Sequence, residues 1–166
     1  MATVTLHGLP IHTAGDLPKI GSKAPEFKLT KKDLTDVKLS DYLGYKVLLN
    51  IFPSIDTGIC AMSVRRFNAE ASNIGDVQVL CISRDLPFAH ARFCGAEGID
   101  KVESLSILRD LQFGKDYGTA IIDGPMAGLM ARVVIIIDEE GLIKYVQVVP
   151  EIGQEPDYES ALNALK

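Results

Sequence analysis

The stretch that decides the fold runs from Lys46 to Ser83 and reads KVLLNIFPSIDTGICAMSVRRFNAEASNIGDVQVLCIS. Its two ends, Lys46–Phe52 and Val77–Ser83, are continuous apolar runs rich in Val, Leu and Ile, as expected for strands buried on both faces. Between them, apolar residues recur at helical spacing from Gly58 onward. A strand, a helix and a strand without a hairpin turn predict a right-handed parallel crossover.

The helices expected here have recognisable ends. Asp56 or Thr57 can cap the first one, because a short polar side chain accepts a hydrogen bond from a free backbone amide. Gly75 is expected to end it, since glycine readily adopts the left-handed conformation found after helices. For a second helix after the second strand, Asp85 is the predicted cap and Gly95 the predicted stop.

The flanking segments extend the pattern. VTLHG and PIHTA alternate around Gly8–Pro10 and predict an N-terminal β-hairpin. Residues 131–138 and 142–150 predict a second hairpin, and PDYESALNAL predicts a C-terminal helix. The order βαβα, then a β-hairpin, then α favours an α/β thioredoxin-like fold, with a central mixed β-sheet flanked by helices. We expect one such domain over residues 1–166.

The composition is that of an ordinary globular protein. Of the 166 residues, 47% are apolar and 23% charged, which argues against disorder. The formal net charge is -5 and no run of Lys and Arg stands out, so nucleic acid and anionic membranes are not expected partners. No apolar run approaches the ~20 residues of a membrane helix, and the N-terminus does not read as a secretion signal. A cytoplasmic location is therefore expected.

The chain has three cysteines: Cys60, Cys81 and Cys94. An odd number without a secretion signal argues against a structural disulfide framework. There is no C-x-x-C and no Cys/His set at metal-ligand spacing, so no metal or other cofactor is expected. His90 would neighbour Cys94 on a helix, which we interpret as incidental. Cys81, in the middle of a predicted buried strand, is expected to be a buried thiol without a role in turnover.

Cys60 lies about three residues into the expected helix, directly after a buried strand and a Pro/Gly turn. The free amides and the dipole of a helix N-terminus favour an anion, so a thiol at this place is more readily a thiolate. The alternative is a buried, inert cysteine that only packs. Position alone supports both interpretations about equally, and the surrounding residues decide between them.

Pro53, Thr57 and Cys60 stand in the order P-x-x-x-T-x-x-C. Peroxide cleavage needs an attacking thiolate, hydrogen-bond donors that stabilise the departing oxygen, and a cation that keeps the sulfur ionised. Thr57 precedes Cys60 by one helical turn, so its hydroxyl can reach the same pocket or serve as a plain N-cap. Pro53 can shield that pocket from water or simply end the strand.

The same residues carry a resemblance to a known family. P-x-x-x-T-x-x-C is the active-site pattern of the peroxiredoxins, and NIFPSIDTGICAMSVRRFN resembles their thiol peroxidase subfamily, of the atypical two-cysteine type. The subfamily pattern is met by Pro53, Ser54, Ile55, Asp56, Thr57, Cys60, Ser63, Arg65, Phe67 and Asn68. The resemblance continues in RFCGAEGI, in DGPMAGLMARVVIIIDEEG and in the EPDYESAL tail, and so covers nearly the whole chain.

The resemblance implies roles for residues that the spacing alone does not select. Arg132, in the segment G-L-x-A-R, corresponds to the arginine that holds the thiolate and the peroxide. Without the resemblance it would be an ordinary surface charge at a strand end. Arg65 would have a supporting role, bracing the helix or Asp56, and Ser63 belongs to the same supporting set.

Cys94 corresponds to the resolving cysteine, which would condense with a Cys60 sulfenic acid to form a redox disulfide. The alternative is a core thiol in an amphipathic helix. A disulfide needs α-carbons within roughly 7 Å, and cysteines on two packed helices need not face each other. We therefore expect the reduced form to hold Cys60 and Cys94 apart, so that local unwinding around both precedes bond formation.

The function that the resemblance implies is a thiol-dependent peroxidase. It would reduce hydrogen peroxide and organic hydroperoxides as a homodimer, with thioredoxin as the reductant. A thiol-disulfide exchange protein on the same fold is disfavoured, because the C-x-x-C of such proteins is absent. A peroxide-sensing protein stays open as an alternative, because sensing would use the same chemistry.

Overall fold

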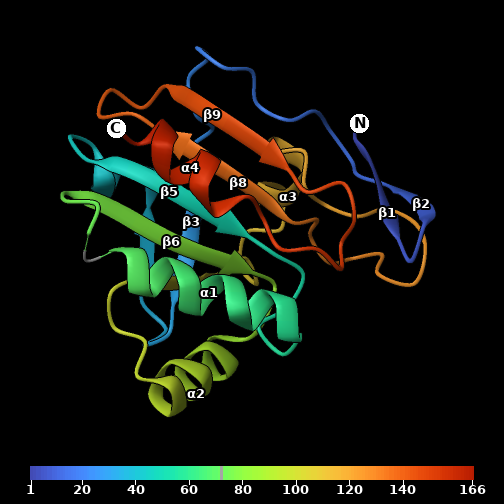
Figure 1. Cartoon of the computed structure of the whole chain (residues 1–166), viewed down its shortest axis with the longest axis horizontal. Coiled ribbons are helices and arrows are strands. Elements are labelled where there is room, and N and C mark those ends of the chain that lie inside the picture. Colours follow the sequence, from blue (N-terminus) through green and yellow to red (C-terminus); the bar gives the residue numbers. More distant parts are fainter. Residues whose placement is uncertain (72) are drawn as a thin grey trace.

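A computed structural model describes residues 1–71 and 73–166 of the chain. Its centre is a seven-stranded mixed sheet with the order β4-β3-β7-β6-β5-β8-β9 (Figure 1). The strands of this sheet are β3 (Lys28–Lys31), β4 (Asp36–Lys38), β5 (Lys46–Ile51), β6 (Val77–Ser83), β7 (Glu103–Ser106), β8 (Val133–Ile137) and β9 (Ile143–Val148). The helices are η1 (Leu39–Tyr42, a 3-10 turn), α1 (Gly58–Ala71), α2 (Pro87–Glu97), α3 (Gln112–Asp116) and α4 (Tyr158–Ala164).

The strand pairing confirms the predicted fold class. β5 pairs in parallel with β6, and α1 connects them, so the expected crossover is present. β8 and β9 form the predicted antiparallel hairpin, and β8 also pairs antiparallel with β5. The predicted N-terminal hairpin is a separate two-stranded sheet of β1 (Thr3–Leu6) and β2 (Leu9–His12). Parallel and antiparallel pairs together make the sheet mixed.

Side chains that alternate along β5 divide the core into two clusters. Leu48 and Phe52 belong to the cluster on the face covered by α1 and α4, together with Cys60. Val47 and Leu49 belong to the opposite cluster, which includes residues of α3. Because both faces of β5 are buried, its sequence is a continuous apolar run rather than an alternating one.

The first helix begins where the sequence predicts and ends earlier. Of the two predicted caps, Thr57 is the one used: its Oγ1 accepts a hydrogen bond from the Cys60 N–H at 3.4 Å. The helix ends at Ala71, so the prediction that it reaches Gly75 is wrong, and Ser72 lies outside the described residues. Gly75 instead has a φ of 75° in the turn that leads to β6.

The predicted ends of α2 are both wrong. Its N-cap is Leu86, whose apolar side chain cannot accept a hydrogen bond, and the carboxylate of Asp85 binds the Ile55 N–H instead. Gly95 lies inside the helix, which continues to Glu97. Gly98 is the residue that ends it, with a left-handed φ of 65° that costs glycine little because it has no Cβ.

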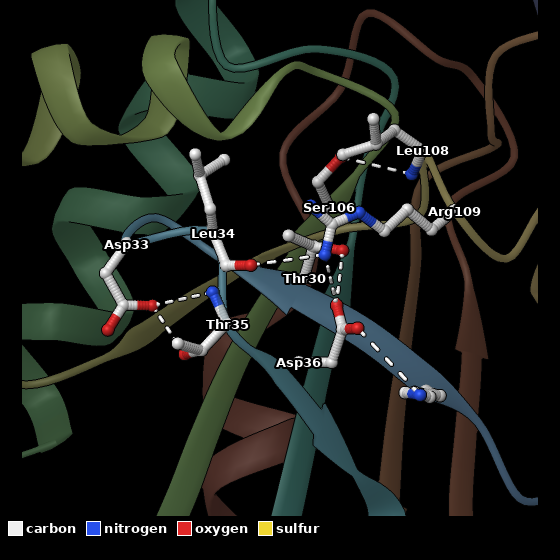
Figure 2. A network of polar contacts seen from close by, with 9 residues as sticks. Thr30, Asp33, Leu34, Thr35, Asp36, Ser106, Leu108 and Arg109 are labelled. Atoms are coloured by element: carbon white, nitrogen blue, oxygen red, sulfur yellow. Dashed lines mark hydrogen bonds and ion pairs between the residues drawn. The ribbon is translucent and has the colours of Figure 1, made fainter.

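Side chains hold the β3–β4 hairpin at one edge of the sheet (Figure 2). Asp36 accepts a hydrogen bond from Arg109 Nη1 at 3.0 Å, and the same nitrogen donates to the Leu34 carbonyl at 3.1 Å. Asp33 accepts from the backbone N–H of Thr35 at 3.0 Å and from its hydroxyl at 2.6 Å. These contacts enclose Leu34, whose φ of 73° is unusual for a residue with a side chain.

The N-terminal hairpin docks on the segment that follows β9. Thr5 N–H donates to the Pro150 carbonyl at 2.8 Å, and Ile152 N–H donates to the Thr5 carbonyl at 2.9 Å. The hairpin thereby fixes the backbone around Ile152, which matters for the site described next. Over residues 1–71 and 73–166, no helix is both long and apolar enough to cross a membrane.

Candidate active site

Cys60 is the third residue of α1 and lies beyond the carboxyl end of β5. Its side chain is fully buried, in the same cluster as Phe52. The Cys60 carbonyl accepts a hydrogen bond from Ser63 Oγ at 2.7 Å, and Ser63 Oγ accepts one from Asn50 Nδ2 at 3.1 Å. Two buried polar side chains therefore tie the first turn of α1 to the central strand. The sequence pattern includes Ser63 and does not include Asn50.

Thr57 joins the loop before α1 to the helix itself. Its hydroxyl donates to the Ser54 carbonyl at 3.0 Å while accepting from the Cys60 N–H. The N-cap role of Thr57 is thus observed, and its hydroxyl lies one turn from Cys60. Pro53 is buried and lies two residues after Ile51, the last residue of β5, which agrees with the strand-ending interpretation.

Arg132 is buried, with 2% of its surface exposed, so the interpretation as a surface charge is wrong. The β5–β8 register pairs Ile51 with Val133, and one further step brings Arg132 beside Phe52. Because side chains alternate along a strand, Arg132 belongs to the same sheet face as Phe52. That face is the one on which α1 places Cys60.

The guanidinium of Arg132 is held from one side only. Its Nε and Nη2 donate to the Ile152 carbonyl at 3.3 and 2.9 Å. Its Nη1 is buried and has no hydrogen-bond partner among the described residues. A buried cationic donor without a partner is unfavourable, so this nitrogen is available to an anion or a polar ligand.

All three cysteines are free and buried. Cys94 Sγ on α2 lies 3.4 Å from Ser104 Oγ on β7, and Cys94 also lines a surface hollow of about 500 Å³. Burial in the middle of β6 raises the pKa of Cys81 to about 12, opposed by a hydrogen bond from Asn50. Cys81 is therefore a protonated and poorly nucleophilic thiol at neutral pH, and its predicted burial is confirmed.

Surface ion pairs link α1 and the loop before it to α2. Arg65 Nη2 lies 2.7 Å from Glu97 Oε1, and this hydrogen-bonded pair lowers the pKa of Glu97. Asp56 pairs instead with Arg92, at 2.7 Å between Oδ1 and Nη2. Of the two alternatives for Arg65, bracing the helix agrees with this contact, because Arg65 ties α1 to α2, while Asp56 is held by Arg92 instead. Its guanidinium also lies 5.5 Å from the centre of the Phe93 ring.

The carboxylate of Asp85 does not cap α2 as predicted but binds the loop before α1. Its Oδ1 accepts from Ser54 Oγ at 2.7 Å, and its Oδ2 accepts from Ile55 N–H at 2.7 Å. Oδ2 also accepts from Ser83 Oγ at 2.5 Å, and that oxygen lies 3.1 Å from His90 Nε2. Polar residues that follow the carboxyl end of a parallel strand often belong to a functional site, and this position is the sequence signal that could have indicated the role of Asp85.

Fold and site together define a class: a thioredoxin-like protein with a cysteine in the first turn of a helix and a buried arginine on the same sheet face. The Redoxin family model matches residues 19–162. A thiol peroxidase of Mycobacterium bovis and one of Mycobacterium tuberculosis are each 54% identical over 165 residues, covering 99% of this chain and 99% of theirs. The chain belongs to the Redoxin family, in the thiol peroxidase subfamily of the peroxiredoxins.

Solved structures agree with this assignment. A peroxiredoxin-like protein from Aquifex aeolicus superposes with a TM-score of 0.94 at 37% identity, covering 99% of this chain and 96% of that one. A thiol peroxidase from Chromobacterium violaceum has a TM-score of 0.88 at 23% identity, covering 98% and 94%. At that lower identity the likeness shows the fold alone.

Proposed function

We propose that this protein is a thiol-dependent peroxidase, an oxidoreductase that reduces hydrogen peroxide and organic hydroperoxides with electrons from thioredoxin. The observation that carries the proposal is the buried Arg132. Its Nη1 has no hydrogen-bond partner among the described residues, and the side chain belongs to the sheet face against which α1 packs Cys60. The thiol peroxidases at 54% identity support the same activity.

In the first step, the Cys60 thiolate attacks one peroxide oxygen. An S–O bond forms, the O–O bond breaks, and the departing alkoxide or hydroxide takes a proton to leave as alcohol or water. Arg132 would donate from Nη1 to the reacting oxygens, and Thr57 would turn its hydroxyl from the Ser54 carbonyl to the peroxide. Pro53 would exclude water from this pocket. The product on the protein is a Cys60 sulfenic acid.

In the second step, the thiolate of Cys94 attacks the sulfenic sulfur, an S–S bond forms, the S–O bond breaks, and the departing hydroxide takes a proton to leave as water. Cys94 is hydrogen-bonded to Ser104 on β7, so it must leave this position before it can reach Cys60. The helix α2 is suited to such a release, because it buries only the stripe Pro87, His90 and Cys94. Its ion pairs with α1 are exposed, and such pairs contribute little stability.

In the third step, thioredoxin would reduce the disulfide. A protein of that size has no access to the buried Cys60, so the unwound region around α2 would present the disulfide to it. A cytoplasmic location would suit this cycle, because glutathione and thioredoxin keep thiols reduced there. Exposed apolar side chains beside the site would suit a homodimer interface: Leu86, Phe88, Leu108, Leu111 and Ile122.

Peroxide consumption with and without thioredoxin and its reductase tests the proposal. Cys60→Ser should abolish consumption, because no other cysteine is placed at the helix start. Cys94→Ser should complete one turnover and then fail to recycle through thioredoxin, and Cys81→Ser is the matched control that should keep full activity. Consumption by Cys60→Ser at the original rate would overturn the proposal. Mass spectrometry after one equivalent of peroxide should show Cys60 linked to Cys94.

A further inference from the structure

We propose that Asp85 is a positioning residue that ties the loop before Cys60 to the helix carrying Cys94, so that the two segments open together. The inference rests on the proposed function in that it takes Cys60 and Cys94 as the reacting pair. What it adds is a buried connection between them through a single carboxylate.

The backbone of Asp85 is fixed to the ends of two parallel strands. Its N–H donates to Oγ of Ser83, the last residue of β6, at 3.1 Å. Its carbonyl accepts from Oγ of Ser106, the last residue of β7, at 2.5 Å. Ser106 Oγ in turn accepts from the Leu108 N–H at 3.2 Å (Figure 2). The carboxylate is therefore presented from the rigid sheet rather than from a mobile loop.

One arm of this connection leads to Cys60. The carboxylate of Asp85 accepts hydrogen bonds from the Ser54 hydroxyl and from the Ile55 N–H, both at 2.7 Å. Hydrogen bonds to an ionised acceptor are the stronger kind, so they restrain this loop well. The Ser54 carbonyl accepts from the Thr57 hydroxyl, which accepts from the Cys60 N–H. A continuous chain of hydrogen bonds thus runs from Asp85 to the first turn of α1.

The other arm leads to Cys94. Ser83 Oγ donates to Asp85 and lies 3.1 Å from Nε2 of His90, one helical turn before Cys94 on α2. Burial lowers the pKa of His90, opposed by the nearby carboxylates of Asp85 and Asp56. Because the Ser83 hydroxyl gives its single hydrogen to Asp85, it can only accept from His90, which assigns the proton of the neutral imidazole to Nε2. His90 Nδ1 is buried and has no partner among the described residues, so this arm is the side chain's connection to the protein.

Sharing one carboxylate couples the two arms. When α2 unwinds, His90 leaves Ser83, and the hydroxyl that supports the Asp85 carboxylate loses one of its two donors, keeping only the Asp85 N–H. Hydrogen bonds in such a chain strengthen one another, so the loss of one arm weakens the other. Unwinding of the Cys94 helix therefore loosens the loop before Cys60, and both cysteines become movable in one event.

Amide hydrogen exchange on the reduced protein tests the coupling without any peroxide. Asp85→Asn keeps the side-chain shape but cannot accept all three hydrogen bonds, so exchange should accelerate about 10-fold in both residues 54–60 and 87–94. Asp123→Asn is the matched control: it also removes a carboxylate with two hydrogen bonds, to His12, and should change neither segment. Acceleration in only one segment, or in neither, would overturn the proposal.

A double-mutant cycle tests whether the hydrogen bonds of the two arms are energetically coupled. Ser54→Ala removes the hydroxyl contact of the loop arm and leaves that of the Ile55 N–H, while Ser83→Ala removes the helix arm, and each should accelerate exchange in both segments. The double variant should exceed the larger single effect only slightly, since both act through one carboxylate. Strictly additive effects, with each variant confined to its own segment, would contradict the coupling. These serine variants carry the test if Asp85→Asn does not fold.

Single-turnover kinetics separates positioning from general destabilisation. In Asp85→Asn, oxidation of Cys60 should slow about 10-fold, because its loop is no longer held, while the later linkage to Cys94 should become faster. General destabilisation does not produce changes of opposite sign, so parallel slowing would overturn the proposal. A wild-type protein that consumes no peroxide would refute the proposed function and leave the exchange result to decide on Asp85.

Discussion

Cys60 and Cys81 are both fully buried, yet their surroundings give them different chemistry. Cys81 lies within β6, where burial raises its pKa and a single side-chain donor, Asn50, faces it. Cys60 lies where α1 begins, near the free amides of the helix N-terminus, and Nη1 of Arg132, buried on the same sheet face, has no partner among the described residues. Burial by itself therefore does not separate an inert thiol from a reactive one.

His90 should make stability depend on pH. Its folded-state pKa is lowered by burial, so below the ordinary value of about 6.5 the unfolded chain binds a proton that the folded protein does not. The free energy of unfolding should then fall with decreasing pH, by up to about 1.4 kcal/mol per pH unit, until the folded-state pKa is reached.

Denaturant unfolding at about pH 7.5 and about pH 5.5 measures this dependence. His90→Gln should remove part of it, and His7→Gln, exposed in the turn of the N-terminal hairpin, is the control that should retain it. Identical pH dependence in wild type and His90→Gln would contradict the prediction.

At the scale of elements, the two helices near the site differ in how firmly they are held. The helix α1 buries a broad face that includes Ala61, Val64 and Phe67, and Phe67 packs edge-on against Tyr158 of α4. The helix α2 buries a single stripe, packs two further apolar side chains only partly against the core, and makes exposed ion pairs with α1 and the loop before it. Since exposed pairs add little, α2 is the element expected to unwind first in the redox cycle.

The backbone of Leu34, in the β3–β4 turn, is strained, and a substitution that relieves this strain should raise the free energy of unfolding. A left-handed conformation costs a residue with a Cβ about 1–2 kcal/mol of folding free energy. Glycine avoids this strain, but it loses more conformational entropy on folding, which offsets roughly 0.5–1 kcal/mol of the gain. Leu34 has a φ of 73° and is 42% exposed, so little burial is lost on its replacement. Leu34→Gly should therefore stabilise the protein by about 0.5–1 kcal/mol.

Thermal or denaturant unfolding checks this gain. Leu43→Gly is the matched control, because Leu43 is also exposed but has an ordinary φ of -57°, so glycine there should stabilise nothing. A Leu34→Gly variant no more stable than wild type would show that the side chain contributes more than its strained backbone costs.

At the scale of the whole molecule, the exposed apolar side chains define an expected interface. Phe88 is 66% exposed in the first turn of α2, and Leu111 is 49% exposed before α3. If these residues form the homodimer interface, Phe88→Asp should raise the dissociation constant at least about 10-fold, because a charge would replace a buried anchor. Sedimentation velocity over a range of concentrations measures the shift toward monomer.

Leu9→Asp is the control for that experiment, because Leu9 is 70% exposed on the N-terminal hairpin, away from α2. It should leave association unchanged. Equal association of wild type and Phe88→Asp would place the interface elsewhere on the molecule.

Local sequence patterns predicted much of the fold, because hydrophobic periodicity and turn residues reflect interactions between residues near in the chain. The apolar runs of β5 and β6 and the helical spacing between them predicted a parallel crossover, which the pairing confirms. Helix ends were less predictable. Asp85 is a residue type that commonly caps helices, but its carboxylate accepts a hydrogen bond from Ser54, a residue 31 positions earlier in the chain. Which donors a polar side chain meets depends on the packing of distant segments, and no local pattern contains that information.

By itself, the sequence determined the strand–helix–strand unit and the place of Cys60 in the first turn of α1, and it narrowed the cap of that helix to Asp56 or Thr57, because periodicity and capping act between near neighbours. Only the tertiary structure decided that Arg132 is buried on the face of Cys60, since that depends on the register of β8 against β5. It alone also connected the Cys60 loop to the Cys94 helix through Asp85. Both features are contacts between residues far apart in the chain, and such contacts exist only once the sheet has assembled.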